Sequence, residues 1–463
     1  MSNVTTDIII LTFYRWLDIE EKMASTLTKV PLLRTVAARS YSQALPVCGN
    51  PNYDLKSTVI SNKLVVAAVE NDSSIARVSI IFKAGSRNET SDNLGATHVI
   101  RTAAGLSTKN ASQFAIIRNV QQVGASITAT TDRETIAYTL EGTKAAIEQA
   151  LPFLTEVATK QVFKPWEVAE LSNRLQLDIA TRSLQIRTID LLHNAAFRSG
   201  LGNSLFIPKN KIGKISSETL QHYVASTFLA GRCAVVGTGV NHGELTHYAQ
   251  QLKINDGSSC PAPSPYKGGE LRSNKGGDLA FVAFAGEGAP ITNTKDALAC
   301  AVLQRALGVG PHVKWSNHDN GVLSKSIGAG QEGYASTAIN VNYSDTGLVG
   351  VLVAAPAKSA KSVVQAAYSV LKNGNISDAD VNRGKNQLKT QLLVDAECGA
   401  TAIHDIATQA VLTGNPQTAA QLAAAVDSVT TVDVQSALRK AGQKLTMAAM
   451  GNLVDVPYLD ELK

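Results

Sequence analysis

The chain contains segments with two different hydrophobic periods, and their order predicts the fold. Short apolar runs predict strands at residues 65–69, 77–83, 125–131, 135–141, 279–285, 336–343 and 348–354. A helical period predicts helices at residues 93–105, 164–187, 295–307 and 377 to about 397. Pro165 suits a first helical turn, and Ser377 is a suitable N-cap. Strands followed by long helices favour an antiparallel-rich α+β sandwich over a doubly wound sheet.

The same order of elements occurs twice along the chain, at an offset of 213 to 214 residues. The matches run in sequence order: Val168, Asn173 and Leu175 recur as Val381, Asn386 and Leu388, Gly200 as Gly414, Ser216-Ser217 as Thr430-Thr431, and residues 234–237 as 448–451. Several matches at nearly constant spacing are hard to obtain by chance, so they predict an internal duplication. We therefore expect two homologous α/β-sandwich modules.

A stretch rich in Gly, Ser and Pro separates the two copies. Residues 257–269 cannot continue a helix or a central strand, which is typical of a linker. We divide the chain into an amino-terminal extension, a first module, a linker and a second module, at residues 1–41, 42–256, 257–277 and 278–463. Two similar halves joined in this way are expected to face each other as a clamshell.

The amino-terminal extension has the composition of a targeting signal. Residues 23–47 contain no Asp or Glu, and three basic residues recur among Leu, Val, Ala, Ser and Thr. Such a segment can form a basic amphipathic helix, as mitochondrial transit peptides do. Arg39 precedes the expected cleavage point, which we place between Tyr41 and Ser42. Residues 1–22 carry four acids and are interpreted as an upstream extension or an alternative start. For residues 23–47, the other interpretation is a disordered tail without acidic residues.

Composition and charge narrow the classes of function. Apolar residues make up 44% of the chain and charged residues 17%, which is an ordinary globular composition. No apolar stretch reaches the roughly 18 residues of a membrane span, and the longest candidate, 346–357, is interpreted as a buried strand. The five cysteines form no C-x-x-C pair, which argues against a disulfide framework and a structural zinc site. The net charge is only +5 and basic residues alternate with acids, so no nucleic-acid partner is expected.

The predicted helix at 93–105 carries the residues that identify a family. It resembles the helix of the pitrilysin/insulinase-type peptidases that bears H-x-x-E-H, in which two His one turn apart bind zinc and the Glu activates water. By position, His98 matches the first ligand, Arg101 the general base and Thr102 the second ligand. The family's third ligand is a Glu further along the chain, where this sequence offers only Gln176 and Asp178.

These replacements predict that the peptidase chemistry is absent. One imidazole does not hold zinc without partners, and an arginine is permanently charged and cannot accept a proton from water. We therefore expect no catalytic residue, no bound metal and no cofactor, with His98 as an ordinary hydrogen-bonding residue. His193 and His404 lie among apolar neighbours and are interpreted as structural, and no G-x-S-x-G motif occurs.

Two mitochondrial branches of this family lack zinc chemistry: the regulatory subunits of the processing peptidase, and the core subunits of respiratory complex III. Residues 307–315 are poorer in glycine than the flexible loop of the regulatory subunits. Four segments are instead similar to the type-2 core subunits: 166–169, 308–314, 343–348 and 447–453. The resemblance extends from about residue 44 to residue 463.

The resemblance implies a non-catalytic subunit that supports the assembly and stability of complex III (ubiquinol–cytochrome c reductase), on the matrix side of the mitochondrial inner membrane. Its partners would be core protein 1, cytochrome b, cytochrome c1 and the Rieske iron–sulfur protein, and the redox cofactors would belong to those partners. The alternative is a regulatory subunit of the processing peptidase. An active protease is disfavoured by Arg101 and Thr102.

Overall fold

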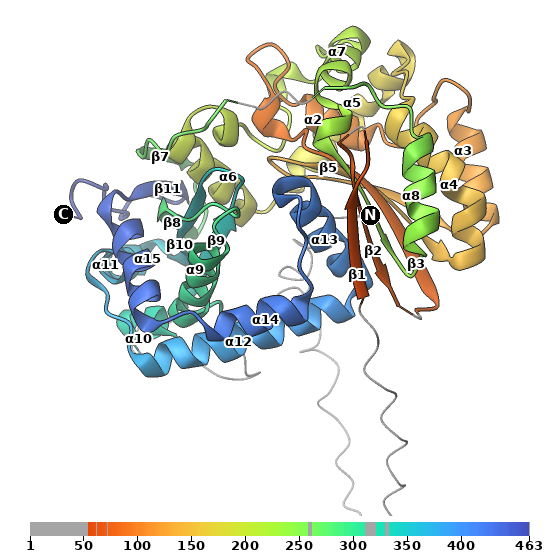
Figure 1. Ribbon diagram of the computed structural model, residues 1–463. Helices are drawn as coiled ribbons and strands as arrows, with labels where there is room; N and C mark the ends of the chain where they lie inside the picture. Colours follow the sequence, from red (N-terminus) through yellow and green to blue (C-terminus); the bar gives the residue numbers. More distant parts are fainter. Residues whose placement is uncertain are drawn as a thin grey trace, which may run out of the picture.

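The computed structural model describes residues 54–462 apart from 62, 72, 258–261, 311–320 and 329–332. Several sequence predictions lie outside these residues: the transit peptide, its cleavage between Tyr41 and Ser42, part of the 257–277 linker, and most of the 307–315 loop. The described chain forms two sheets, and helices pack against both of them (Figure 1).

The first sheet has six strands: β1 (Asp54–Val59), β2 (Val65–Glu70), β3 (Ile75–Phe82), β4 (Ser126–Thr131), β5 (Ile136–Thr143) and β6 (Cys233–Thr238). Their order across the sheet is β1-β2-β6-β3-β5-β4. Only the β2–β6 pair is parallel, and the other neighbours are antiparallel.

The second sheet has five strands: β7 (Glu270–Asn274), β8 (Leu279–Glu287), β9 (Ala335–Asn342), β10 (Gly347–Pro356) and β11 (Thr446–Gly451). Their order, β7-β11-β8-β10-β9, repeats β2-β6-β3-β5-β4 of the first sheet, and β7–β11 is again the parallel pair. The duplication predicted from the spacing of a few residues is therefore confirmed in strand order and direction.

The helices repeat in part. The first half contains α2 (Ala96–Thr102), α3 (Gln113–Gln122), α4 (Lys144–Thr159), α5 (Pro165–Ala180), α6 (Leu184–Phe197), α7 (Ser217–Thr227) and α8 (His242–Gln251). The second half contains α9 (Thr294–Leu307), α10 (Val322–Ile327), α11 (Ala360–Asn373), α12 (Asp378–Glu397), α13 (Gly399–Thr413), α14 (Ala419–Asp427) and α15 (Thr431–Gln443). Helices α8 and α14 have no α-helical counterpart among the described residues of the other half. Ser216 and Thr430, matched in the sequence, are the N-caps of α7 and α15, because each hydroxyl accepts a hydrogen bond from the N–H three residues on. Ser377 caps α12 in the same way.

One helix of each half covers the sheet of the other half. On the first sheet, Ala67, Ile81 and Val236 pack against four buried residues of α13: Ile403, Ile406, Ala407 and Ala410. On the second sheet, Ala283, Leu352 and Ala448 pack against three buried residues of α6: Leu192, Ala196 and Phe197. Figure 1 shows α13, in dark blue, lying against the first sheet although it belongs to the second copy. Helices α6 and α13 are therefore exchanged between the two halves, because each packs on the sheet of the half to which it does not belong.

The structure differs from the sequence predictions at several elements. The helix predicted at 164–187 is two helices: α5 ends at Ala180, and Ser183 accepts a hydrogen bond from the Ile186 N–H as the N-cap of α6. The linker predicted at 257–277 includes strand β7, whose residues are mostly polar and half-buried and give no apolar alternation. Strand β1 was not predicted for the same reason, since nearly all its side chains are exposed.

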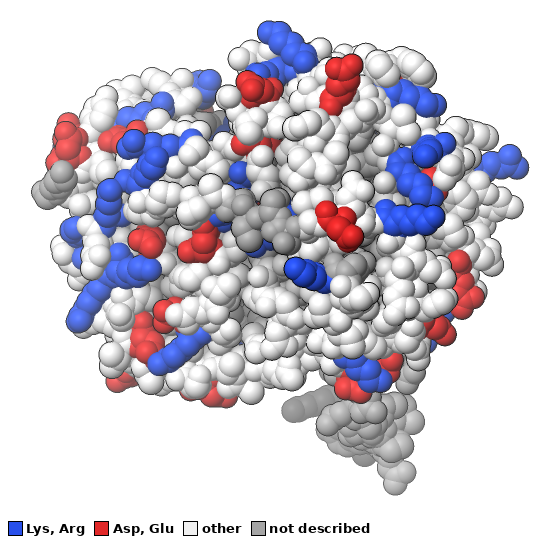
Figure 2. Space-filling model, turned by 45° about the horizontal axis from the view of Figure 1, so that its top comes forward, with Lys and Arg blue, Asp and Glu red and all other residues white. Residues whose placement is uncertain are grey.

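The apolar stretch at 346–357 forms β10, whose residues are mostly buried, as the sequence predicted. Within the part of the chain that the structure describes, no helix has the length and apolar character needed to cross a bilayer. Over the face drawn in Figure 2, basic and acidic side chains are scattered among uncharged ones, in agreement with their alternation in the sequence.

Candidate functional site

Helix α2, which carries the family motif, is fixed at its start by a buried carboxylate. Glu89 accepts hydrogen bonds from the Gly95 N–H at 2.8 Å, the Thr97 N–H at 2.9 Å and the Thr97 hydroxyl at 2.6 Å. Burial raises the pKa of Glu89 to about 7, although these hydrogen bonds oppose the shift. Gly95 has φ +91°, and a Cβ there would lie 2.6 Å from the Cα of Ile207. The backbone before His98 is therefore held in one position.

His98 is completely buried and hydrogen-bonded on both ring nitrogens. Its Nδ1 accepts from the Ile207 N–H at 3.3 Å, so its Nε2 carries the proton and faces Oδ2 of Asp178 at 3.4 Å. Burial, followed by the charge of Arg101, lowers the pKa of His98 to about 4, which outweighs the opposing effect of Asp178. The ring is therefore neutral near pH 7 and ties α2 to α5.

The other motif positions are arranged differently from metal ligands. Thr102 donates its hydroxyl to the carbonyl oxygen of His98 at 2.8 Å and so bonds within its own helix. Arg101 directs Nη2 toward Oδ2 of Asp178, at 3.7 Å. Asp178, on α5, thus faces both His98 and Arg101, whereas Gln176 is exposed. Sequence reasoning located Asp178 in the right neighbourhood but assigned it no partner.

This set of donors does not fit a zinc ion. A zinc site needs at least three protein ligands, and the site offers one imidazole and one carboxylate beside a guanidinium. Over the described residues there is no group of three or more His, Cys, Asp or Glu side chains that could hold a metal ion. Arg101, which the sequence comparison matched to the general base of the family motif, instead forms an ion pair with Asp178.

A second polar cluster joins the two halves. Two hairpin turns that are equivalent in the duplication, β4–β5 and β9–β10, meet at Arg87. Arg87 Nη1 lies 2.7 Å from Oε1 of Glu134 in the first turn and 2.8 Å from Oδ1 of Asp345 in the second. Glu134 also accepts from the Ser344 N–H at 2.8 Å, and Asp345 accepts from the Ser264 N–H at 3.1 Å. These five residues are called the Arg87 cluster below.

His193 and His404 have structural partners, as the sequence predicted. His193 donates Nδ1–H to the Ile189 carbonyl at 2.7 Å and accepts from the Tyr343 hydroxyl at 2.8 Å, across the two halves. Burial lowers the pKa of His193 to about 3. His404 on α13 pairs with Asp132 of the first half at 3.3 Å. Burial alone would lower the pKa of His404, but its hydrogen bond to Asp132 raises it.

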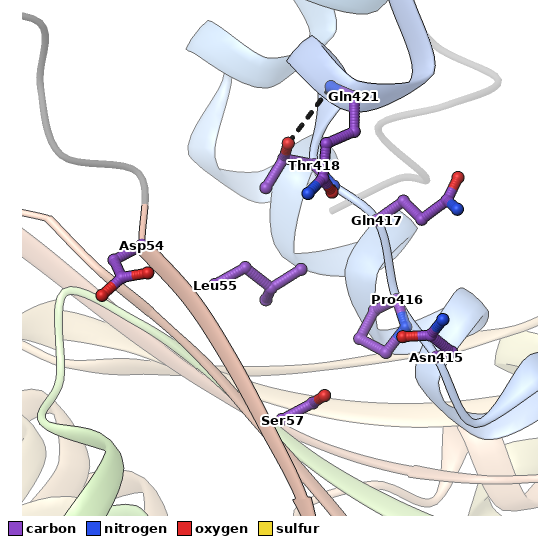
Figure 3. Close-up of a pocket in the computed structure, with 8 residues that line it drawn as sticks. All are labelled: Asp54, Leu55, Ser57, Asn415, Pro416, Gln417, Thr418 and Gln421. Atoms are coloured by element: carbon purple, nitrogen blue, oxygen red, sulfur yellow. Dashed lines mark hydrogen bonds between the residues drawn. The ribbon is translucent and has the colours of Figure 1, made fainter. Parts of the chain in front are cut away.

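An open pocket lies between the edge strand β1 and the connection from α13 to α14 (Figure 3). Its volume is about 500 Å³, and its lining residues are Asp54, Leu55, Ser57, Asn415, Pro416, Gln417, Thr418 and Gln421. Asp54 is the single ionisable side chain of this lining. The pocket therefore offers neither an acid–base pair nor a set of metal ligands.

Comparison with known proteins places this geometry in a family. The family model for insulinase (peptidase family M16) matches residues 65–209, and the model for the peptidase M16 inactive domain matches residues 214–388. The mitochondrial cytochrome b-c1 complex subunit 2 of Mus musculus is 40% identical over 418 residues, which are 88% of this chain and 92% of that protein. The Homo sapiens protein of that name is 37% identical over 438 residues, covering 92% and 96%.

More distant relatives include peptidase subunits. The mitochondrial-processing peptidase subunit alpha-2 of Dictyostelium discoideum is 27% identical over 422 residues, which are 88% of this chain and 94% of that protein. The two family models match successive parts of the chain, and relatives well above 30% identity cover nearly all of it. The chain therefore belongs to the insulinase-type (M16) peptidase family, together with the mitochondrial cytochrome b-c1 complex subunit 2 proteins.

Proposed function

We propose that this chain is a non-catalytic core subunit of respiratory complex III, which supports assembly and stability of the complex on the matrix side of the mitochondrial inner membrane. The observation that carries this proposal is the 37–40% identity to cytochrome b-c1 complex subunit 2 over about nine-tenths of the chain. The processing-peptidase subunits reach only 26–28% over similar lengths. Its partners in the complex would be core protein 1, cytochrome b, cytochrome c1 and the Rieske protein.

The geometry of the degenerate motif supports the absence of catalysis. Arg101 cannot act as a general base, and Thr102 bonds to its own helix backbone. Asp178 is engaged by His98 and Arg101. The residues at the motif thus stabilise the fold around α2 and α5, and electron transfer would be the work of cofactors in the partner subunits.

Import into mitochondria is part of the proposal, and the sequence supports it through the acid-free segment 23–47. The mature protein is expected to begin at Ser42, or within a few residues of it, after cleavage behind Tyr41. Amino-terminal sequencing of the protein isolated from mitochondria measures this directly. A mature protein that begins at Met1 would contradict the targeting signal.

A regulatory subunit of the processing peptidase is the second candidate, since alpha subunits of that enzyme match most of the chain. The segment 307–315 contains fewer glycines than the glycine-rich loop of the regulatory subunits, which argues against this function. The two functions also differ in what their loss does. A core subunit affects complex III, whereas a processing subunit affects the maturation of imported precursors.

Depletion of the chain is therefore expected to lower the amount of assembled complex III, measured as haem-containing complex on native gels of mitochondrial membranes. Re-expression of the full chain should restore the complex, and so should a chain with Thr102→Ser, which keeps the hydroxyl. The isolated complex should hold no stoichiometric zinc bound to this subunit. Undiminished complex III together with accumulating precursors would establish the processing function instead.

A further inference from the structure

The surroundings of Arg101 carry more positive than negative charge. Arg174 on α5 is exposed, while Arg182 and Arg187 follow the end of that helix. Arg101 and Arg182 are largely buried, with side chains only 15% and 16% exposed. Among the described residues, Asp178 is the single carboxylate that pairs with Arg101, at 3.7 Å, which is too long for a hydrogen bond.

The nearest carboxylate to Arg182 is already engaged by other groups. Asp190 lies 4.0 Å from Nη1 of Arg182, but it accepts from Arg133 Nη2 at 2.7 Å and from the Ser204 hydroxyl at 2.6 Å. The Nε atoms of Arg182 and Arg187 are buried and have no hydrogen-bond partner among the described residues. Such buried donors are costly unless a partner is supplied.

Both buried guanidinium groups are held by the same aromatic ring. The Cζ atom of Arg182 lies 4.1 Å from the ring centroid of Phe206, and the Cζ of Arg101 lies 6.0 Å from it. Phe206 also packs edge-on against His98. A guanidinium that stacks on an aromatic ring makes a cation–π contact through its flat face. The N–H groups at its edge remain available to donate hydrogen bonds to a ligand.

The electrostatic balance favours an added anion. Burial, followed by repulsion from a second arginine, lowers the pKa of Arg101 and of Arg182; Arg174 repels the first and Arg187 the second. Asp178 and Asp190 raise the two pKa values but do not offset the burial. An oxyanion beside Arg101 and Arg182 would supply negative charge to both guanidiniums and an acceptor for the unpartnered Nε–H of Arg182.

We propose that the position of the family's zinc site is an oxyanion-binding site in this chain, formed by Arg101 and Arg182 on the Phe206 ring with Arg174 at its rim. The family's zinc site binds a dication, whereas the positive charge of this site would bind the negative charge of a phosphate or carboxylate group. A guanidinium fork binds either group through paired N–H donors. The inference does not depend on membership of complex III.

The test is protection of arginines in the full-length mature protein from a dicarbonyl reagent, read peptide by peptide by mass spectrometry. Inorganic phosphate and a tetraglutamate peptide are added separately at constant ionic strength. With either ligand at about ten times its dissociation constant, modification of Arg101 and Arg182 should slow roughly tenfold, since about nine-tenths of the sites are occupied. Exposed Arg118 on α3 is the internal control and should react at an unchanged rate.

The two ligands separate the sources of the oxyanion. Protection by phosphate identifies a free or phosphoryl anion, and protection by tetraglutamate alone identifies a carboxylate of a polypeptide; either supports the site. Arg182→Gln should abolish the protection of Arg101, whereas Arg118→Gln should leave it intact. The proposal is wrong if neither ligand slows the modification of Arg101 and Arg182, or if Arg118 is protected to the same extent.

Discussion

Replacing Arg87 by methionine is expected to lower the free energy of unfolding by roughly 3–5 kcal/mol, which is the usual cost of leaving a buried carboxylate unpaired. The side chains of Arg87 and Glu134 are only 3% and 4% exposed. Removal of the guanidinium would leave Glu134 and Asp345 close together without their common cation. Methionine keeps much of the aliphatic volume, so the effect measured would be mainly electrostatic. Denaturant-induced unfolding of the mature chain, followed by circular dichroism, provides the measurement.

Two further variants make this prediction specific. A triple variant with Arg87→Met, Glu134→Gln and Asp345→Asn contains no unpaired charge and should recover much of the loss. Lys56→Met removes an exposed partner of Glu70, an ion pair at 2.6 Å on strands β1 and β2, and should cost far less, because solvent screens an exposed pair. If Arg87→Met were as mild as Lys56→Met, the Arg87 cluster would not stabilise the contact between the halves.

The Arg87 cluster also bears on the movement of the halves. It joins two equivalent hairpin turns, one from each copy, and His193 and His404 make further contacts from one copy to the other. Several polar contacts between the halves, most of them buried, fix a single orientation, because each loses its partner if the halves separate. A fixed orientation suits a structural subunit of a permanent assembly.

The sequence predicted seven of the strands, where apolar periodicity was strong, but it assigned no strand to β6 and β11, although both are fully buried and their residues were matched in the duplication. Strands β3, β5, β8 and β10 are central or apolar and lie within a few residues of their predicted ranges. Strands β1 and β7 were missed because an edge strand can be polar and half-exposed, so that its pairing leaves no pattern in the side chains. The division between α5 and α6 depends on a cap at Ser183 and on a tertiary contact with the other sheet.

Within the candidate site, the sequence predicted the relative positions of the motif residues on one helix and not the residues that surround them. His98, Arg101 and Thr102 follow from the helix position, since residues on one helix have a fixed spacing. Phe206 and Arg182 come from a loop and a helix junction far along the chain, and only folding brings them to Arg101. The net charge around Arg101 therefore could not be predicted from the sequence, because the residues that contribute to it are far apart along the chain.

The largest effect is expected when the chain is divided after residue 260, so that each copy is a separate polypeptide. Neither copy should fold alone, because α6 and α13 cover each other's sheets. Without α13, the first sheet would expose a face that includes Ala67, Ile81 and Val236. Burial of one large apolar side chain contributes about 1.5–3 kcal/mol. The loss of several such contacts is comparable with a whole domain's stability of about 5–15 kcal/mol.

Expression of residues 42–260 alone should accordingly yield aggregated protein, while co-expression with residues 261–463 should yield a soluble one-to-one complex that unfolds in a single transition. A charged residue introduced on α13 tests whether the packing of this helix on the first sheet causes the association. Ala407→Glu, at a fully buried position of α13, should prevent the two fragments from associating. Gln417→Glu, in the loop after α13, should not. The exchange would not be required for folding if the first fragment were monomeric and unfolded cooperatively by itself. A stable isolated fragment would mean that the first sheet tolerates the loss of α13, and that the duplication retains two independent folding units.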